Sequence, residues 1–234
     1  MTEFCKMRAL RFKELSGLVG IILLAGVSLE NGTALGQTTN TDAVPLDQAL
    51  GKSSGESFWE GQPGEGFQST VQTVGIEAGG VAGFAAFGSR QAHDLALMHI
   101  SYGHMLSHVV GVGHWYRGNW ELRGELFGGA EFRPSNEWLI GLTPHLRYNW
   151  ATGTRFIPFI DGGAGVTATG IGPPDLSNTF EFNLQGALGV HWFAGEHIAV
   201  TAEARYLHLS CAGISHPNLG LNGVMGLVGL TYFF

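Results

Sequence analysis

Apolar and polar residues alternate with a period of two through much of this chain, and this alternation restricts its fold more than any other feature. In residues 138–150 the even positions carry apolar or aromatic side chains, whereas the odd positions include His145 and Arg147. Residues 120–126 and 180–192 show the same alternation. Successive side chains of a β-strand point to opposite faces, so these segments predict strands with one apolar and one polar face.

Segments of strand length follow one another after residue 68, and each is bounded by Gly, Pro, Asn or Asp. We expect eight strands, at residues 69–80, 93–106, 117–132, 137–150, 155–170, 179–194, 197–211 and 220–234. An even number of strands allows an antiparallel sheet to close with both chain ends on the same side. The expected fold class is therefore all-β, an eight-stranded antiparallel up-and-down barrel.

The period alone does not distinguish a water-soluble β-sandwich, whose apolar faces point inward, from a membrane barrel, whose apolar faces meet lipid. Three features favour a transmembrane β-barrel: an N-terminal export signal, aromatic residues at both ends of the apolar face of residues 138–150, and opposite charges on the polar faces that can pair inside. The last strand ends at Phe234 and resembles the C-terminal recognition strand of bacterial outer-membrane barrels. We therefore expect the chain in the bacterial outer membrane.

Residues 1–36 have the organisation of a secretory signal peptide. A basic start is followed by an apolar run at residues 15–29 and by small residues before Gln37, where we expect cleavage. The alternative is an uncleaved membrane anchor, but the apolar run is short for a spanning helix of ~20 residues. Residues 37–68 are polar and predict a flexible periplasmic leader, which leaves residues 69–234 for the barrel.

Charge and cysteine content exclude several functions. The chain has 12 Lys and Arg against 19 Asp and Glu, and this acidic balance argues against nucleic acid as a partner. Removal of the signal peptide would leave Cys211 alone, so no intramolecular disulfide is expected. We expect neither a metal nor a cofactor, because the spacing of the His residues at 99–114 matches no compact ligand motif. A small-ligand channel is disfavoured, since side chains fill an eight-stranded interior.

Two polar residues continue the apolar face of the seventh expected strand. The alternation of residues 198–206 places His208 and Ser210 on the outward face, near the outer end of the strand. Their Cβ atoms would lie ~5 to 7 Å apart, so the imidazole could act as base for the hydroxyl. The ordinary alternative is that both residues lie in the headgroup zone of the membrane, where polar side chains cost little.

The longer segment at residues 208–222 resembles the C-terminal signature of the lipid A 3-O-deacylase family. This resemblance implies an outer-membrane serine hydrolase that removes an ester-linked hydroxyacyl chain from lipid A in the outer leaflet. It implies Ser210 as nucleophile and His208 as general base, with backbone N–H groups of Ala212 and Gly213 at the oxyanion.

Two positions depart from the family pattern. Asn222 stands where characterised members carry the Glu of the catalytic triad, and Cys211 stands where they carry Asn. Alternation places Asn222 on the face toward lipid and Cys211 on the face opposite Ser210, so Cys211 is not expected to act as a nucleophile. An Asn can orient a neutral imidazole, but loss of the acid from a Ser-His-Asp triad costs roughly 10⁴-fold in kcat.

Two hypotheses follow for the function. The first is a lipid A deacylase-like carboxylic ester hydrolase that acts on lipid A or another outer-leaflet lipid, with Asn222 orienting His208. The second is a catalytically inactive structural or adhesive barrel. Under the first, an Asn222→Glu change is expected to raise activity. Both hypotheses allow a homodimer.

Overall fold

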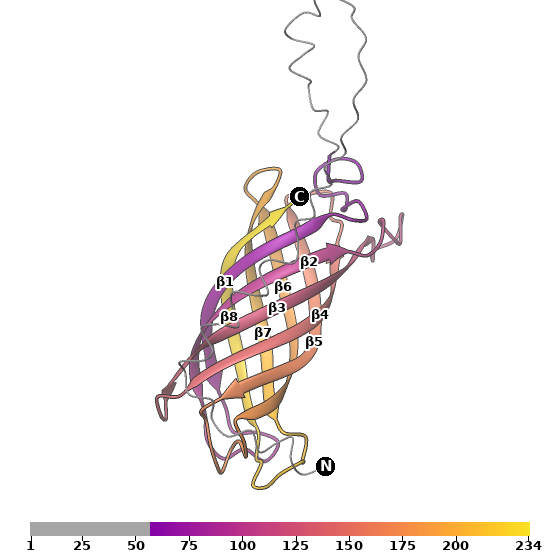
Figure 1. Ribbon diagram of the computed structural model, residues 1–234. Coiled ribbons are helices and arrows are strands. Elements are labelled where there is room, and N and C mark those ends of the chain that lie inside the picture. The colour runs from indigo at the N-terminus through magenta and orange to yellow at the C-terminus, as the bar shows by residue number, and fades with distance from the viewer. Residues whose placement is uncertain (1–56) are drawn as a thin grey trace, which may run out of the picture. The chain divides into compact units, whose positions relative to one another are not determined.

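The computed structural model describes residues 57–234, which form a closed antiparallel barrel (Figure 1). Its strands are β1 (Gln72–Gly83), β2 (Asp94–Met105), β3 (Gly118–Arg133), β4 (Trp138–Trp150), β5 (Phe156–Thr169), β6 (Phe180–Phe193), β7 (Ile198–Ser210) and β8 (Leu221–Phe233). Each strand pairs with its neighbours in sequence, and β8 pairs with β1 to close the sheet. The predicted eight-stranded all-β barrel is confirmed. The described residues contain no helix long and apolar enough to cross a membrane.

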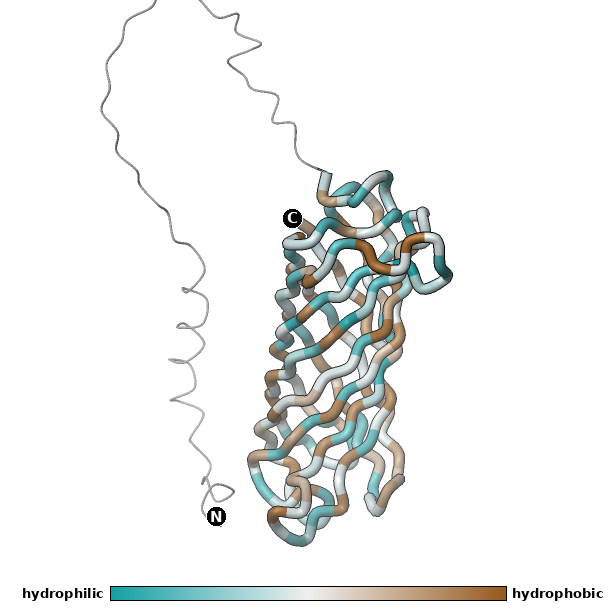
Figure 2. The backbone as a smooth tube through the Cα atoms, turned by 90° about the vertical axis from the view of Figure 1, so that its right-hand side faces the viewer, coloured by the Kyte–Doolittle hydropathy of each residue, from teal (hydrophilic) through white to brown (hydrophobic). Residues whose placement is uncertain are grey.

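The outer wall of the barrel is apolar and the middle of its interior is polar, which is the reverse of a soluble sandwich. In β4, for example, Leu142 is 53% exposed whereas the adjacent Thr143 is fully buried. The same alternation of hydrophobic and hydrophilic residues runs along the strands in Figure 2. This arrangement excludes the soluble sandwich with inward apolar faces, which the period alone left open.

Charged side chains pair across the middle of the interior, as the opposite charges on the polar faces predict. Arg205 donates to Glu125 and Glu203, each at 2.5 Å, and Arg147 donates to Asp161 at 2.9 Å. These side chains are buried, so each charge depends on its partners for the solvation that water would otherwise supply. The network links strands on opposite sides of the barrel.

The end of the barrel where the C-terminus lies, marked in Figure 1, is closed by an aromatic cap. Phe58, Trp59 and Phe67 precede β1 and pack against Phe193 and Phe233, with ring centroids of Phe67 and Phe233 5.1 Å apart. The boundary expected at residue 68 therefore lies inside a folded segment rather than at the end of a flexible leader. The signal peptide expected at residues 1–36 and the first part of the leader lie outside the described residues.

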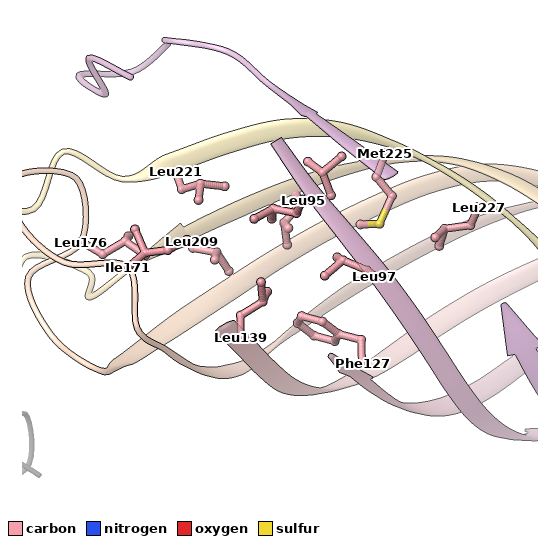
Figure 3. Close-up of a cluster of buried hydrophobic side chains, with 12 residues drawn as sticks. Leu95, Leu97, Phe127, Leu139, Ile171, Leu176, Leu209, Leu221, Met225 and Leu227 are labelled. Carbon is pink, nitrogen blue, oxygen red and sulfur yellow. The ribbon is translucent and has the colours of Figure 1, made fainter. Parts of the chain in front are cut away.

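The opposite end carries the connections at residues 84–93, 134–137, 170–179 and 211–220, and we call it the loop end. A second apolar cluster fills the barrel beneath these loops (Figure 3), and it consists of Val81, Leu95, Leu97, Phe127, Leu139, Ile171, Leu176, Leu207, Leu209, Leu221, Met225 and Leu227. Ile171 and Leu176 reach into it from the loop between β5 and β6. Leu207, Leu209 and Leu221 fix the inner faces of β7 and β8, which sets the direction of the outward side chains between them.

The interior network predicts a strong dependence of stability on Arg205. Replacement by Ala would remove the cation that hydrogen-bonds to both Glu125 and Glu203 and leave buried charge less compensated, at a cost of about 3–5 kcal/mol in the free energy of unfolding. The measurement is a urea titration of refolded protein. Gel migration reports the folded fraction, because folded and heat-denatured barrel migrate differently. Arg90→Ala is the control, because Arg90 lies exposed in a loop. Equal unfolding midpoints for the two variants would contradict the prediction.

Candidate active site

His208, Ser210 and Asn222 lie together on the outer wall at the loop end. His208 pairs directly with Asn222 across β7 and β8, and Ser210 is the last residue of β7. His208 and Ser210 are half-buried on the outward face, whereas Leu207 and Leu209 between them are fully buried inside. The structure thus places both residues on the outward face, where the alternation in the sequence predicts them.

The imidazole of His208 is oriented by the side chain of Asn222. Its Nδ1 donates a hydrogen bond to Asn222 Oδ1 at 2.8 Å, which leaves Nε2 as the ring nitrogen with a free lone pair. Within residues 57–234 neither His208 Nε2 nor the Ser210 hydroxyl forms a hydrogen bond. Catalytic hydrogen bonds often tighten only when substrate binds, so this open geometry is compatible with a base and its nucleophile.

The environment of Asn222 differs from the sequence prediction. Asn222 has the outward parity of its strand, but it is 1% exposed and does not face lipid. The loop between β1 and β2 covers it, since Asn222 Nδ2 donates to the backbone carbonyl of Ala86 at 2.9 Å and to Ser89 Oγ at 3.3 Å. The hydroxyl of Tyr206 donates to Asn222 Oδ1 at 2.7 Å. Alternation gives the face of a strand residue, but it cannot show which loop folds over that face.

The turn after Ser210 presents free backbone donors. Ala212 and Gly213 have φ angles of 53° and 77°, in the left-handed region that an alanine seldom adopts. Both residues are exposed, and within the described residues their N–H groups donate no hydrogen bond. The flanking N–H groups are occupied, because Cys211 donates to Asn218 Oδ1 and Ile214 donates to the carbonyl of Cys211. The two residues assigned to the oxyanion by resemblance therefore have donors available.

Cys211 is a structural residue behind the site. It is 1% exposed, and its Sγ accepts hydrogen bonds from the Ser177 hydroxyl at 3.1 Å and from the Ser215 N–H at 3.4 Å. The thiol thus joins the β5–β6 loop to the β7–β8 loop. Its position agrees with the expectation that Cys211 lies on the opposite side from Ser210.

Gly220 is a further part of the site, which the sequence analysis did not single out. It has a φ of 80°, and a Cβ atom built on it would lie 3.1 Å from His208 Cε1. The N–H groups of Leu219 and Gly220 donate to the carbonyl of Asp175, at 3.0 and 2.9 Å. The available signal was the glycine itself, placed two residues before Asn222 in the segment that resembles the family signature.

A buried histidine ties the loops together behind Gly220. His93 Nδ1 contacts the Glu131 carboxylate, and His93 Nε2 lies 3.3 Å from Asp175 Oδ2. All three side chains are buried. The β1–β2 loop, the end of β3 and the β5–β6 loop are therefore joined through His93, and Asp175 extends this support to the backbone beside His208.

Comparison with known proteins shows the family of this chain. The family model described as lipid A 3-O-deacylase (PagL) matches residues 100–231, more than half of the chain and a range that contains the whole site. Lipid A deacylase PagL of Bordetella bronchiseptica is 32% identical over 134 residues, which cover 52% of this chain and 67% of that protein. The crystal structure of the outer membrane enzyme PagL is 18% identical and superposes with a TM-score of 0.50, covering 67% of this chain and 97% of that one, so it supports the fold. The chain belongs to the lipid A 3-O-deacylase (PagL) family.

Proposed function

We propose that this protein is a carboxylic ester hydrolase of the bacterial outer membrane that removes an ester-linked acyl chain from lipid A in the outer leaflet. One observation carries the proposal: Asn222 orients His208 on the outer wall with its Nε2 free, on the same face as Ser210. Membership of the lipid A 3-O-deacylase family supplies the class of substrate. A cleaved signal peptide at residues 1–36 is part of the proposal, since an outer-membrane protein must be exported.

The reaction begins when the Ser210 hydroxyl attacks the ester carbonyl of a lipid beside the barrel wall. The hydroxyl proton passes to His208 Nε2, and the negative charge on the tetrahedral oxygen is stabilised by the N–H groups of Ala212 and Gly213. Collapse of this intermediate expels the sugar alkoxide, which takes the proton from His208. Water then attacks the acyl carbonyl while His208 takes its proton, and the Ser210 oxygen leaves with that proton, which frees the acyl chain as a fatty acid and restores the hydroxyl.

Asn222 has a limited role in this mechanism because its amide is uncharged. It fixes the ring orientation of His208 and places the proton on Nδ1, so that Nε2 acts as the base. It stabilises the imidazolium less than a carboxylate would. We therefore expect this protein to be a slower hydrolase than relatives whose triad contains an acid.

The first test is mass spectrometry of lipid A after incubation with refolded protein. Wild type is expected to remove one acyl mass, and Ser210→Ala is expected to lower the rate by roughly 10³-fold or more, because the nucleophile is lost. A parallel incubation with phospholipid tests whether the activity extends to another outer-leaflet ester. Unchanged spectra for wild type, with correct folding shown by gel migration, would favour the catalytically inactive structural or adhesive barrel.

A second test addresses the support of His208 by Gly220. Gly220→Ala would place a methyl group against the imidazole and strain a left-handed backbone, so the rate of deacylation is expected to fall roughly 10-fold or more. Gly172→Ala is the matched control, because a Cβ atom at Gly172, also at the loop end, meets nothing within 4 Å. Equal rates for the two folded variants would show that Gly220 does not position the ring.

A further inference from the structure

Two elements of the barrel meet at the side chain of Asn222, which belongs to β8. Tyr206 and His208 approach from β7, and the turn at residues 86–89 approaches from the β1–β2 loop. The contact between Asn222 and Ala86 joins residues that are 136 positions apart in the sequence. The side chain that orients the imidazole is therefore also the attachment point of a loop.

The partners of Asn222 determine which way its amide points. The carbonyl oxygen of Ala86 can only accept a hydrogen bond, so the group that faces it at 2.9 Å must be the NH₂ group. The amide oxygen then faces Tyr206 and His208, and it accepts from the tyrosine hydroxyl at 2.7 Å and from His208 Nδ1 at 2.8 Å. The loop thus fixes the amide, and the amide fixes which nitrogen of His208 carries the proton.

The turn at residues 86–89 is built to present acceptors. The Ser89 N–H donates to the Ala86 carbonyl at 3.0 Å, and Phe87 and Gly88 have φ angles of 54° and 109°. The Ser89 hydroxyl donates its proton to the Ala86 carbonyl at 3.0 Å and accepts from the Ala86 N–H at 2.9 Å. Its proton is therefore in use, and the hydroxyl offers Asn222 only a lone pair.

A carboxylate at position 222 would meet this turn without a proton to donate. Its second oxygen would face the Ala86 carbonyl and the Ser89 oxygen, in a position that is 1% exposed for Asn222. Two acceptors in contact repel, and a buried charge without a donor loses its solvation. The geometry at this position therefore favours an amide over an acid.

We propose that the turn at residues 86–89 is a clamp that positions the catalytic histidine through Asn222, and that it makes this site dependent on an amide at position 222, with Tyr206 as a second positioning residue. This inference rests on the proposed function, since the histidine it positions is the proposed base. It reverses the expectation from sequence that Asn222→Glu raises activity. The amide is then an adapted part of the site and not the remnant of a lost acid.

The experiment compares Asn222→Asp with Asn136→Asp in two assays. Asn136 is exposed in the β3–β4 loop, so its variant adds the same charge at the same end of the barrel without touching the clamp. We expect Asn222→Asp to lower kcat at least ~10-fold, and Asn136→Asp to keep the wild-type value. Cleavage by trypsin reports whether the β1–β2 loop is released, because the exposed Arg90 follows Ser89. We expect faster cleavage at Arg90 in Asn222→Asp and the wild-type rate in Asn136→Asp.

Two further variants test the clamp without a new charge. Ser89→Ala removes one acceptor, and it is expected to accelerate cleavage at Arg90 and to lower kcat. Tyr206→Phe keeps the ring but removes the hydroxyl, so kcat is expected to fall about fivefold, the effect of one hydrogen bond, with KM unchanged. A purely structural effect of either change would alter folding or KM and not kcat alone.

The outcomes separate this inference from the proposed function. Faster hydrolysis by Asn222→Asp or Asn222→Glu than by wild type would overturn the clamp, as would unchanged cleavage at Arg90 in both Asn222→Asp and Ser89→Ala. If wild type and all variants leave every lipid intact, the hydrolase is refuted. Accelerated cleavage at Arg90 would then still establish that Asn222 holds the loop.

Discussion

The narrow interior of a closed eight-stranded barrel is the constraint on which the rest of this structure depends. Side chains of opposite charge occupy its middle, and there is little room beside them. A Cβ atom on Gly103 would lie 2.1 Å from Glu121 Oε1, and one on Gly141 would lie 2.3 Å from the ring of Phe127. Glycine at these positions makes room for the large inward side chains, which accounts for part of the 37 glycines in the chain.

Closure of the barrel also explains why the sequence was informative. Each strand residue has only two environments, so alternation was enough to predict the number of strands, their antiparallel order and the outward placement of His208 and Ser210. The interior ion pairs follow from the same argument, because charged residues that cannot face lipid must pair inside. In each case the alternation within a single strand gives the face of the residue, although the ion pairs themselves join distant strands.

The features that the sequence did not predict depend on contacts between distant segments. The cover over Asn222 comes from Ala86 and Ser89, and the aromatic cap joins Phe58 to Phe233. Loops and chain ends have no period, and their burial depends on the shape of the surface that they meet. The same limit applies to Gly220, whose importance lies in its distance from the ring of His208.

The aromatic cap has a consequence for the order in which the protein assembles. Phe58 and Phe67 come first among the described residues, yet their partner Phe233 is the last inward side chain of the chain. The cap cannot be completed until β8 has joined β1, because only then does Phe233 point into the barrel. Contacts of such large sequence separation form slowly, so the segment that is synthesised early is among the last to be buried.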